Sequence, residues 1–378
     1  MLAKFFKAAS YSDGWSSFQD DLILVTDRIT ALEYTERFTK VGEFSLTLPF
    51  SADVFKIFMR EGIINGTVYI DSRWFWIQSI AYDYKTITLT GKDCKGMLST
   101  RVTEYGTAQS AAEQGYDIAE GTTKECIEHY VSYNAMSPSP TSAYRRLPIV
   151  EVNGVDGLSN DSYMTHLEVL SDVVELLCTD ADIGYTVRGR FRNEQSSGFV
   201  LTTLKGVDRS HEQSDRPRVI FSVSHGNVLS MSCEHGVDDL VTTVYATDTN
   251  GITREVHREG DAAGLLHRES NISVGLSSTT ETEDYYSKYV LNEVADNVET
   301  HSYSITVRAA DYGAAYSLGD YVSVLDDYTK NMEKKQITEV SRSYAAGQMS
   351  VGITLGAPKQ KPFQRLNNDL ISGTARRR

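Results

Sequence analysis

Two stretches with the same order of strands and turns decide the fold that this sequence predicts. The first is INGTVYIDSRWFWIQSIAYDYKTITLTG, residues 64–91, and the second is LGDYVSVLDDYTKNMEKKQITEVSRSYAAGQMSVGITLG, residues 318–356. Each has a glycine, an alternating strand, a polar turn, a strand with an isoleucine near its start, a second turn and a final alternating strand. We interpret them as an internal repeat, and the alternative is that ordinary β-meanders share these features by chance.

Alternation of apolar and polar residues continues outside the two stretches, for example in EFSLTLPF (residues 43–50) and YSITVR (303–308). Such alternation is typical of antiparallel strands that are buried on one face. Asn-Gly pairs at 65–66, 153–154 and 250–251 favour tight turns, because both residue types tolerate positive φ. The sequence therefore predicts a protein made mostly of β-sheet.

Three amphipathic helices are predicted among the strands. Each follows a capping-box pattern, Thr-x-x-Glu, at Thr122–Glu125, Thr165–Glu168 and Thr280–Glu283. The fold class that we predict is a β-rich α+β protein with two tube-like antiparallel β-barrels, each interrupted by a helix-containing insertion.

This order of elements predicts five parts of the chain. They are a first β-barrel (1–105 plus 206–235), an α/β insertion domain (106–205), a second β-barrel (236–251 plus 302–357), a smaller helix-containing insertion (252–301) and a basic C-terminal tail (358–378).

The charge of the chain excludes some classes of function. Asp and Glu number 51 and Lys and Arg 37, which gives a net charge of −14. A surface dedicated to nucleic acid needs clustered basic residues, and a membrane-surface helix does too. No stretch approaches the roughly 20 apolar residues of a membrane span. Four cysteines without CxxC spacing indicate reduced thiols and assembly in a reducing cytoplasm.

Motifs for catalysis and for metal binding are missing, so we assign no catalytic, cofactor-binding or metal-ligating residue. The nearest match to a calcium loop has Asp248, Asn250 and Gly251, but its first and twelfth positions are Ala246 and His257. A hairpin turn explains the same residues. The eight histidines lack helical spacing, although two pairs ten residues apart are compatible with contacts across a hairpin.

The aromatic cluster Trp74-Phe75-Trp76 has two interpretations. It is compatible with a platform for a sugar, but in a strand Trp74 and Trp76 share one face and Phe75 takes the other. We therefore expect these residues in the core or in a subunit interface.

Four stretches, taken in order, resemble the tail-associated (Tal) or baseplate-hub proteins of tailed bacteriophages, including the hub-like tail proteins of siphophages. They are TERFTKVGEFSLTLPF, ITLTGKDCKGMLSTRV, RVIFSVSHGNVLSMSCEHGVDDLVTTVYA, and YSLGDYVSV followed by QITEVSRSY. The resemblance implies a structural protein of the virion and not an enzyme. It also implies a homotrimer in which two barrels per subunit give six, so that a threefold ring matches the sixfold tail tube.

The resemblance further implies partners at the tail tip. These are a distal tail protein or tail tube protein above the ring, the tape measure protein in its lumen, and a separate spike, fibre or receptor-binding protein below. DNA would pass through the channel during ejection without stable binding, and we expect acidic residues on the channel wall. A receptor-binding or carbohydrate-binding adhesin and a tail-tip cell-wall hydrolase are the two alternative functions.

Overall fold

The computed structural model describes residues 1–7, 22–104, 117–138, 144–165, 167–192, 195–258, 263–275, 278, 283–294, 297, 300–308, 311–327 and 330–356. The chain divides into two compact units, which are described separately. Unit 1 contains Met1–Met231 and Ser304–Leu355, and unit 2 contains Ser232–Tyr303 and Gly356–Arg378. Within the described ranges, every helix is too short or too polar to cross a membrane.

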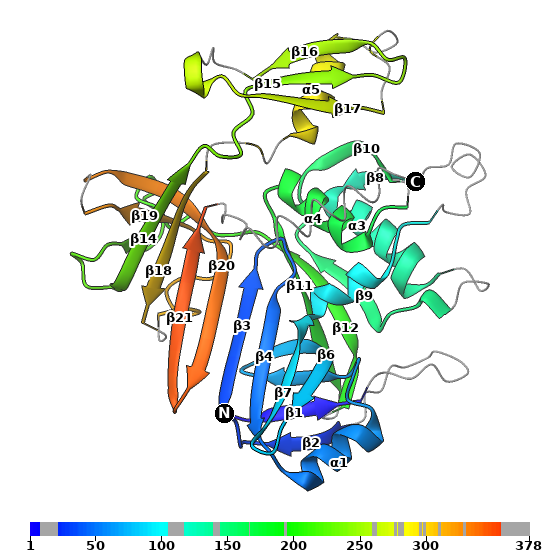
Figure 1. The fold of residues 1–378 in the computed structure, drawn as a ribbon, viewed down its shortest axis with the longest axis vertical. Helices are drawn as coiled ribbons and strands as arrows, with labels where there is room; N and C mark the ends of the chain where they lie inside the picture. The colour runs from blue at the N-terminus through cyan, green and yellow to red at the C-terminus, as the bar shows by residue number, and fades with distance from the viewer. Residues whose placement is uncertain are drawn as a thin grey trace. The chain divides into compact units, whose positions relative to one another are not determined.

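The largest sheet dominates the fold. Its strands are β1 (Ala3–Phe6), β2 (Leu22–Thr26), β3 (Ala31–Arg37), β4 (Glu43–Pro49), β5 (Thr67–Ile70), β6 (Arg73–Tyr82), β7 (Thr86–Asp93), β13 (Ile220–Phe221), β14 (Val228–Gly236), β18 (Thr300–Val307), β19 (Tyr321–Leu325), β20 (Met332–Ala345) and β21 (Gln348–Leu355). They follow the order β14-β18-β21-β20-β3-β4-β7-β6-β5-β1-β2, with β19 on β20 and β13 on β19. In Figure 1, β21, β20, β3 and β4 lie side by side.

The strands of the two predicted barrels belong to this one sheet, and no sheet of the described strands closes into a barrel. The reason is the pairing of β20 with β3, which runs from Ala31–Ala345 to Arg37–Glu339 and joins the two halves edge to edge. Period-two alternation specifies which face of a strand is buried, but it does not specify which strand lies next to it. The β-rich prediction is confirmed, whereas two closed barrels within the chain are not observed.

The predicted repeat is present as two three-stranded meanders, β5-β6-β7 and β19-β20-β21. In both, the middle strand pairs first with the strand before it and then with the strand after it, and a bulge follows Ile77 or Ile337. The backbone N–H of Asn65 donates to Ile77 O at 2.8 Å, and that of Gly319 donates to Ile337 O at 2.8 Å. The two meanders therefore match at the level of single hydrogen bonds.

The segment between β7 and β13 builds the second core of unit 1. Its elements are the 3-10 helix η1 (Cys94–Thr100), β8 (Asp117–Thr122), α3 (Thr123–Val131), the π-helical turn η2 (Ser132–Met136), β9 (Ile149–Gly154), β10 (Ser159–Thr165), α4 (Leu170–Asp180), β11 (Gly184–Arg192) and β12 (Gln195–Leu204). β11, β12 and β9 form a three-stranded sheet, and β10 pairs with β8. Apolar faces of α3 and α4 pack in the same buried cluster as β11 and β12.

All three predicted helices are present, but the predicted N-terminal cap of the second one is wrong. Thr122 and Glu125 form the predicted capping box of α3. Thr165 ends β10, and α4 begins after Val169, because Leu167 has φ of 55° and breaks a helical path there. The third helix is α5 (Glu283–Glu293), whose predicted cap Thr280 lies outside the described residues.

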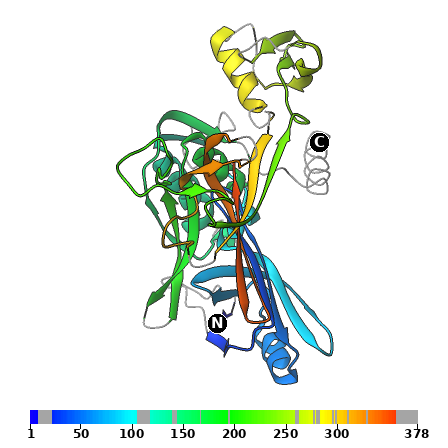
Figure 2. The ribbon, with the colours of Figure 1, turned by 90° about the vertical axis from the view of Figure 1, so that its left-hand side faces the viewer.

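One helix was not predicted from the sequence. It is α1 (Ala52–Glu61), capped by the Ser51 side chain, which accepts from the Val54 N–H at 3.5 Å. Phe58 of α1 is buried against Phe5 of β1, with ring centroids 5.1 Å apart. In both ribbon views α1 lies at the end of the sheet that carries β1 and β2 (Figures 1 and 2).

Unit 2 has its own small core. Its strands are β15 (Thr243–Thr247), β16 (Thr253–His257) and β17 (Glu269–Ser273), and η4 (Gly264–Leu266) lies between the last two. β15 is the central strand, and α5 contributes Tyr286 and Val290 to the buried cluster against this sheet. The Asn250–Gly251 turn joins β15 to β16, with Gly251 at φ of 79°, as the sequence predicted.

Candidate functional site

The large sheet has an apolar face and a polar face, and the aromatic cluster in β6 marks the division. Phe75 is buried in the core of the sheet, where it stacks on Phe44 at 4.9 Å. Trp74 points the other way, into the core of the inserted segment, with its ring 5.5 Å from that of Phe199. Trp76 packs against the same second core. The prediction that the two tryptophans share a face opposite Phe75 is confirmed.

Beyond the tryptophans, the polar face carries short side chains across six strands. Paired positions define two rows that cross β6, β7, β4, β3, β20 and β21 in that order. The rows are Ser79, Thr90, Ser45, Glu33, Ser343 and Ser350, and Ala81, Thr88, Thr47, Ala31, Ala345 and Gln348.

Neighbouring hydroxyls in these rows are hydrogen-bonded. Ser79 Oγ lies 2.9 Å from Thr90 Oγ1, and Ser343 Oγ lies 2.6 Å from Ser350 Oγ. All the side chains in both rows are half-buried or exposed. We call this surface the hydroxyl face, and Glu33 is the one charged residue in its two rows.

The two ends of the repeated strand order are free among the described residues. The order β3-β4-β7-β6 of the first half corresponds to β14-β18-β21-β20 of the second half. β20 uses its outer edge, beyond the part that pairs with β19, to bind β3. No described strand occupies the corresponding edge of β6 beyond Ile77, or the outer edge of β14.

A charged cavity of 450 Å³ lies in unit 1 where β3, β6, β11 and the segment 312–318 meet. Arg73 Nε donates to Glu36 Oε1 at 2.5 Å, and the Asp71 carboxylate accepts from Arg342 at 2.8 Å and from the Tyr34 hydroxyl at 2.5 Å. Burial and the bond to Asp71 raise the pKa of Tyr34, so its hydroxyl keeps its proton and donates. These pairs hold three parts of the chain together.

Lys95 and Asp93 are the most deeply buried charges beside this cavity. The Lys95 side chain is 4% exposed, and its Nζ donates to the carbonyls of Arg37, at 2.6 Å, and Lys40. The Asp93 carboxylate lies 3.5 Å away, and burial raises its pKa despite the nearby ammonium group. Lys95 thus ties η1 to the loop that follows β3.

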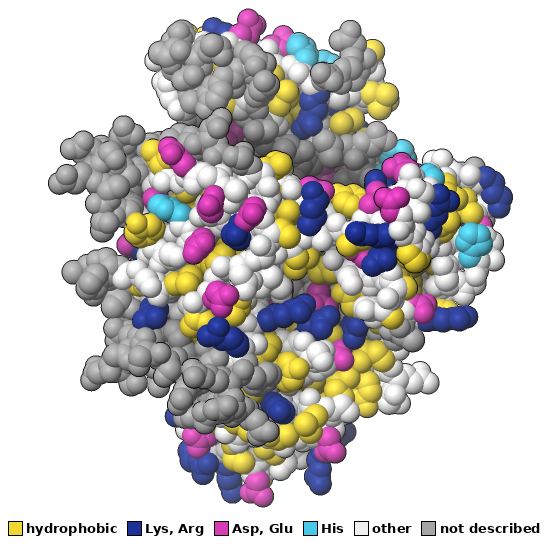
Figure 3. Space-filling model, turned by 180° about the vertical axis from the view of Figure 1, so that it is seen from behind, with side chains coloured by type: hydrophobic (Ala, Val, Ile, Leu, Met, Phe, Trp, Pro, Cys, Tyr) yellow, Lys and Arg dark blue, Asp and Glu magenta, His cyan; other side chains and the backbone are white. Residues whose placement is uncertain are grey.

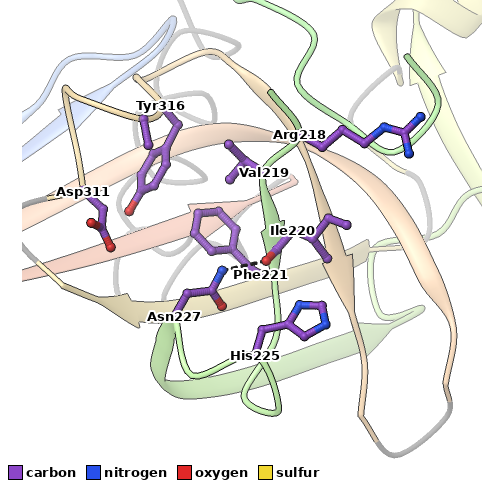
Figure 4. Close-up of a pocket in the computed structure, with 9 residues that line it drawn as sticks. Arg218, Val219, Ile220, Phe221, His225, Asn227, Asp311 and Tyr316 are labelled. Carbon is purple, nitrogen blue, oxygen red and sulfur yellow. Dashed lines mark hydrogen bonds between the residues drawn. The ribbon is translucent and has the colours of Figure 1, made fainter. Parts of the chain in front are cut away.

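A second cavity, of 330 Å³, lies beside the start of β14. Figure 4 shows Phe221 and Tyr316 facing each other across it, and their rings meet edge to face at 5.1 Å. The Asn227 side chain donates to Ile220 O at 2.7 Å and so fixes the loop that leads into β14. His225 stands in this loop and is exposed.

The residues that most resembled a calcium loop form a turn. The Asp248 carboxylate accepts from the N–H groups of Asn250 and Ile252, both at 2.8 Å, and from Ser278. Burial raises the pKa of Asp248, but these bonds outweigh it and hold the pKa at about 2. Within the described ranges no cluster of three metal-ligating side chains has coordinating geometry.

Other predicted features have mixed outcomes. Cys94, Cys126, Cys178 and Cys233 are free thiols, and the first three are buried. His235, a member of one of the histidine pairs with spacing ten, has its ring centroid 5.2 Å from that of His301 on the adjacent strand. The basic tail, 358–378, lies outside the described residues.

Several residues that organise unit 1 were missed by the reasoning from sequence. Asp320 is 4% exposed and accepts from Val207 N–H at 2.8 Å and from Arg209 Nε at 3.0 Å. Its neighbour Gly319 has φ of 91°, and a Cβ there would lie 2.1 Å from the ring of Phe38. The Leu-Gly-Asp sequence was the available signal, because only glycine fits that conformation and contact.

Acidic and basic side chains are interspersed on the face of the molecule that Figure 3 shows, with hydrophobic side chains between them.

Comparisons with known proteins place this fold among phage tail proteins. Residues 19–357 match the model of a family described as Siphovirus ReqiPepy6 Gp37-like protein. A comparison with curated proteins found no match.

Three similar solved structures are prophage or bacterial tail proteins. The 43 kDa tail protein of prophage MuSo2 from Shewanella oneidensis is 14% identical with a TM-score of 0.54, over 93% of this chain and 97% of that chain. A tail protein from Neisseria meningitidis is 12% identical with a TM-score of 0.57, over 94% and 96%. Prophage tail protein gp18 from Listeria monocytogenes is 9% identical with a TM-score of 0.50, over 96% and 97%. These similarities confirm the resemblance to phage tail proteins at the level of the fold.

Proposed function

Because this chain belongs to the Siphovirus ReqiPepy6 Gp37-like family and shares its fold with phage tail proteins, we propose that it is the hub protein of a phage tail tip. Family membership makes it a structural component of the virion tail. The proposal adds a position at the tip, reached after assembly in the host cytoplasm, and a homotrimeric ring around a channel.

The observation that carries the proposal is the pair of equivalent meanders in one sheet. In both middle strands a register shift follows the isoleucine, Ile77 or Ile337, and the same backbone hydrogen bonds accompany both. One chain therefore presents the same strand arrangement twice. Three chains present it six times, which suits a threefold ring that docks on a sixfold tail tube.

Closure of such a ring also removes the free edges of the sheet. An exposed edge strand is a template for uncontrolled pairing, and closed sheets abolish the edges altogether. The two predicted barrels then correspond to the two halves of each chain's sheet, which complete a closed wall only with the neighbouring chains. The five-part division of the chain is kept in this proposal, except that β13 and β14, within 206–235, go with the second half of the sheet, whose strands they pair with. The inserted segments lie outside the wall.

The hydroxyl face is the surface that we assign to the channel. On the strands of the first half, the opposite face is buried under α1, β1 and β2, whereas the rows through Ser79 and Ala81 are half-buried or exposed. Since Glu33 is the one charge in these rows, the proposed wall is nearly neutral, and this replaces the expectation of an acidic lumen. A wall without clustered cations has no means of neutralising DNA phosphates, so DNA would pass without being held.

The partners that we propose are other tail components. The proposed function is structural and includes no catalysis. A distal tail protein or tail tube protein would bind above the ring, and the tape measure protein would end in the lumen. A separate spike, fibre or receptor-binding protein would bind below.

Measurement of the mass of the purified protein tests the ring. Sedimentation velocity and mass photometry are expected to give a species near three times 42.1 kDa, alone or after mixing with the cognate tube or distal tail protein. Electron microscopy of tail tips with a tagged chain should place it at the tip. A protein that stays monomeric under both conditions, with the tag elsewhere on the virion, would contradict the proposal.

A further inference from the structure

The contact between β3 and β20 provides an internal example of how the two halves of this sheet join. It is antiparallel, and it runs from Ala31–Ala345 to Arg37–Glu339. The Phe38 N–H donates to Thr338 O at 2.9 Å, and the Arg37 guanidinium lies 2.7 Å from the Glu339 carboxylate. In the spatial order of the repeat, β20 is the last strand of the second half and β3 is the first strand of the first half.

The complementary contact is missing within the described chain. The last strand of the first half is β6, and the first strand of the second half is β14. These strands lie at opposite ends of the repeated order, and they do not pair with each other within the described chain. Both edges concerned, 78–82 of β6 and 228–231 of β14, belong to unit 1.

We propose that the edge of β6 pairs with β14 of a second copy of this chain, in the same antiparallel manner as β20 pairs with β3. The inference rests on the proposed ring and names the surfaces that build it. The contact is heterologous, because two different edges meet, and such contacts close into a ring when the rotation per copy is a simple fraction of a turn.

Exposed apolar side chains support these two surfaces. Tyr82 and Tyr84 at the end of the β6–β7 hairpin are 59% and 84% exposed, and Val223 and Leu229 beside and within β14 are 52% and 63% exposed. Large apolar groups at both ends of an unpaired sheet are what an interface between chains would cover.

The internal example also places the two ends of the contact. Ala31, the first residue of β3, pairs with Ala345, beside the tip of the β20–β21 hairpin. By analogy, the tip of the β6–β7 hairpin lies beside the start of β14 of the next copy. Tyr84 then approaches the loop of His225 and the cavity of Figure 4.

A second copy fits these edges better than an unrelated protein. The chain already contains one working version of the contact, and the missing version needs only the two free edges of the same sheet. Pairing β6 with β14 throughout covers both of these edges in every copy, whereas a partner of another kind would cover one edge and leave the other.

Cross-linking between copies tests the pairing. In a Cys233→Ser background, Ala81→Cys and Ser230→Cys are combined and treated with a short bismaleimide, while the mass of the unlinked assembly is measured in parallel. The control combines Ala81→Cys with Leu176→Cys, an exposed position on α4 (49% exposed). If Ala81→Cys does not fold, Ser79→Cys takes its place. We expect linked dimers and trimers from the edge pair, nothing beyond trimers, and no linkage in the control.

The other possible outcomes distinguish failure of the β6–β14 contact from failure of the trimeric ring. A trimer by mass without linkage of the edge pair overturns the β6–β14 contact and leaves the trimeric hub standing. A monomer by mass without linkage overturns the ring and the contact together. A ladder that continues beyond trimers supports the contact but overturns the closed ring.

A charge exchange provides a second readout. Ala81→Glu with Ser230→Glu is expected to shift the sedimenting species from trimer to monomer, because like charges would face each other at every interface. Ala81→Lys with Ser230→Glu should retain the trimer. As a matched control, Ala345→Glu with Gln348→Glu adds the same charges at exposed positions between paired strands and should also leave the trimer in place. Equal behaviour of all three variants would contradict the proposal.

Discussion

Removal of the Lys95 ammonium is expected to be among the most damaging single changes in unit 1. In Lys95→Met, the Asp93 carboxylate loses its counter-ion at 3.5 Å, and the carbonyls of Arg37 and Lys40 lose their donor. Both charged side chains are largely buried, at 4% and 14% exposure. Loss of one partner of a buried ion pair costs about 3–5 kcal/mol, so we expect a decrease of that size in the free energy of unfolding at pH 7.

Urea denaturation at several pH values measures this effect. Burial already raises the folded-state pKa of Asp93 above its ordinary value of 3.8, and loss of Lys95 raises it further. A carboxyl group with a raised pKa destabilises the folded state above that pKa, where it must be charged, and ceases to do so once it is protonated. The deficit of Lys95→Met should therefore shrink as the pH is lowered towards the raised pKa of Asp93.

A double mutant and a control variant complete the experiment. Lys95→Met with Asp93→Asn should recover part of the lost stability at pH 7, because the buried negative charge is gone. Lys40→Met removes a half-exposed lysine, 3.6 Å from Glu175, and should change the free energy of unfolding by less than about 0.5 kcal/mol. The reasoning is refuted if Lys95→Met unfolds like the wild type, or if its deficit neither depends on pH nor responds to Asp93→Asn.

Three further predictions concern other parts of the chain. The hydrogen bond from Lys334 holds the pKa of Asp208 at about 2, so Asp208→Asn should lower the free energy of unfolding at pH 7. The difference from the wild type should be lost as the pH falls from 3.8 through 2. Equal unfolding midpoints at pH 7 would contradict this prediction. Asp248→Ala should reduce the protection of β15 and β16 amides from hydrogen exchange, because the turn loses three backbone partners, and unchanged protection would refute the role of that carboxylate. Phe75→Ala should cost about 3–5 kcal/mol in urea denaturation, since its side chain is 1% exposed, and a loss below about 1 kcal/mol would show that the core repacks.

Local features of the fold were predictable because neighbours along the chain fix them. The two meanders follow from alternation and from turns a few residues long, and Asn65 has the positive φ, 66°, that its Asn-Gly pair suggested. The faces of Trp74 and Phe75 follow from the period of a strand.

Contacts between distant residues were not predictable from these patterns. Arg37 and Glu339, which help to join β3 to β20, are 302 residues apart, and nothing near either one identifies the other. The charged cavity depends in the same way on Asp71 and Arg342. Each half of the sequence, taken alone, predicts a closed barrel, because the partner strand from the other half is not visible in its pattern.

The starts of α4 and α1 show that the Thr-x-x-Glu motif is neither sufficient nor necessary for a helix to begin. Thr165–Glu168 has the letters of a capping box, but Thr165 belongs to β10, and the turn at Leu167 separates it from α4. Ser51 carries no such motif, yet it caps α1, and Gly62 ends that helix with φ of 72°. Signals at both ends of α1 are present in the sequence, but they do not have the form Thr-x-x-Glu.

The union of β3 and β20 has a consequence for biosynthesis. A ribosome adds about 5–20 residues per second, so the roughly 300 residues between these strands take on the order of 15–60 s to appear. During that time β3 has left the ribosome but its partner strand β20 has not been synthesised, so the edge of β3 can pair with other nascent chains on the same messenger RNA. A chain that borrows β20 from its neighbour would form the right pairing between the wrong molecules. Production of this protein should therefore suffer from crowded polysomes, and slower initiation should increase the yield of soluble chains.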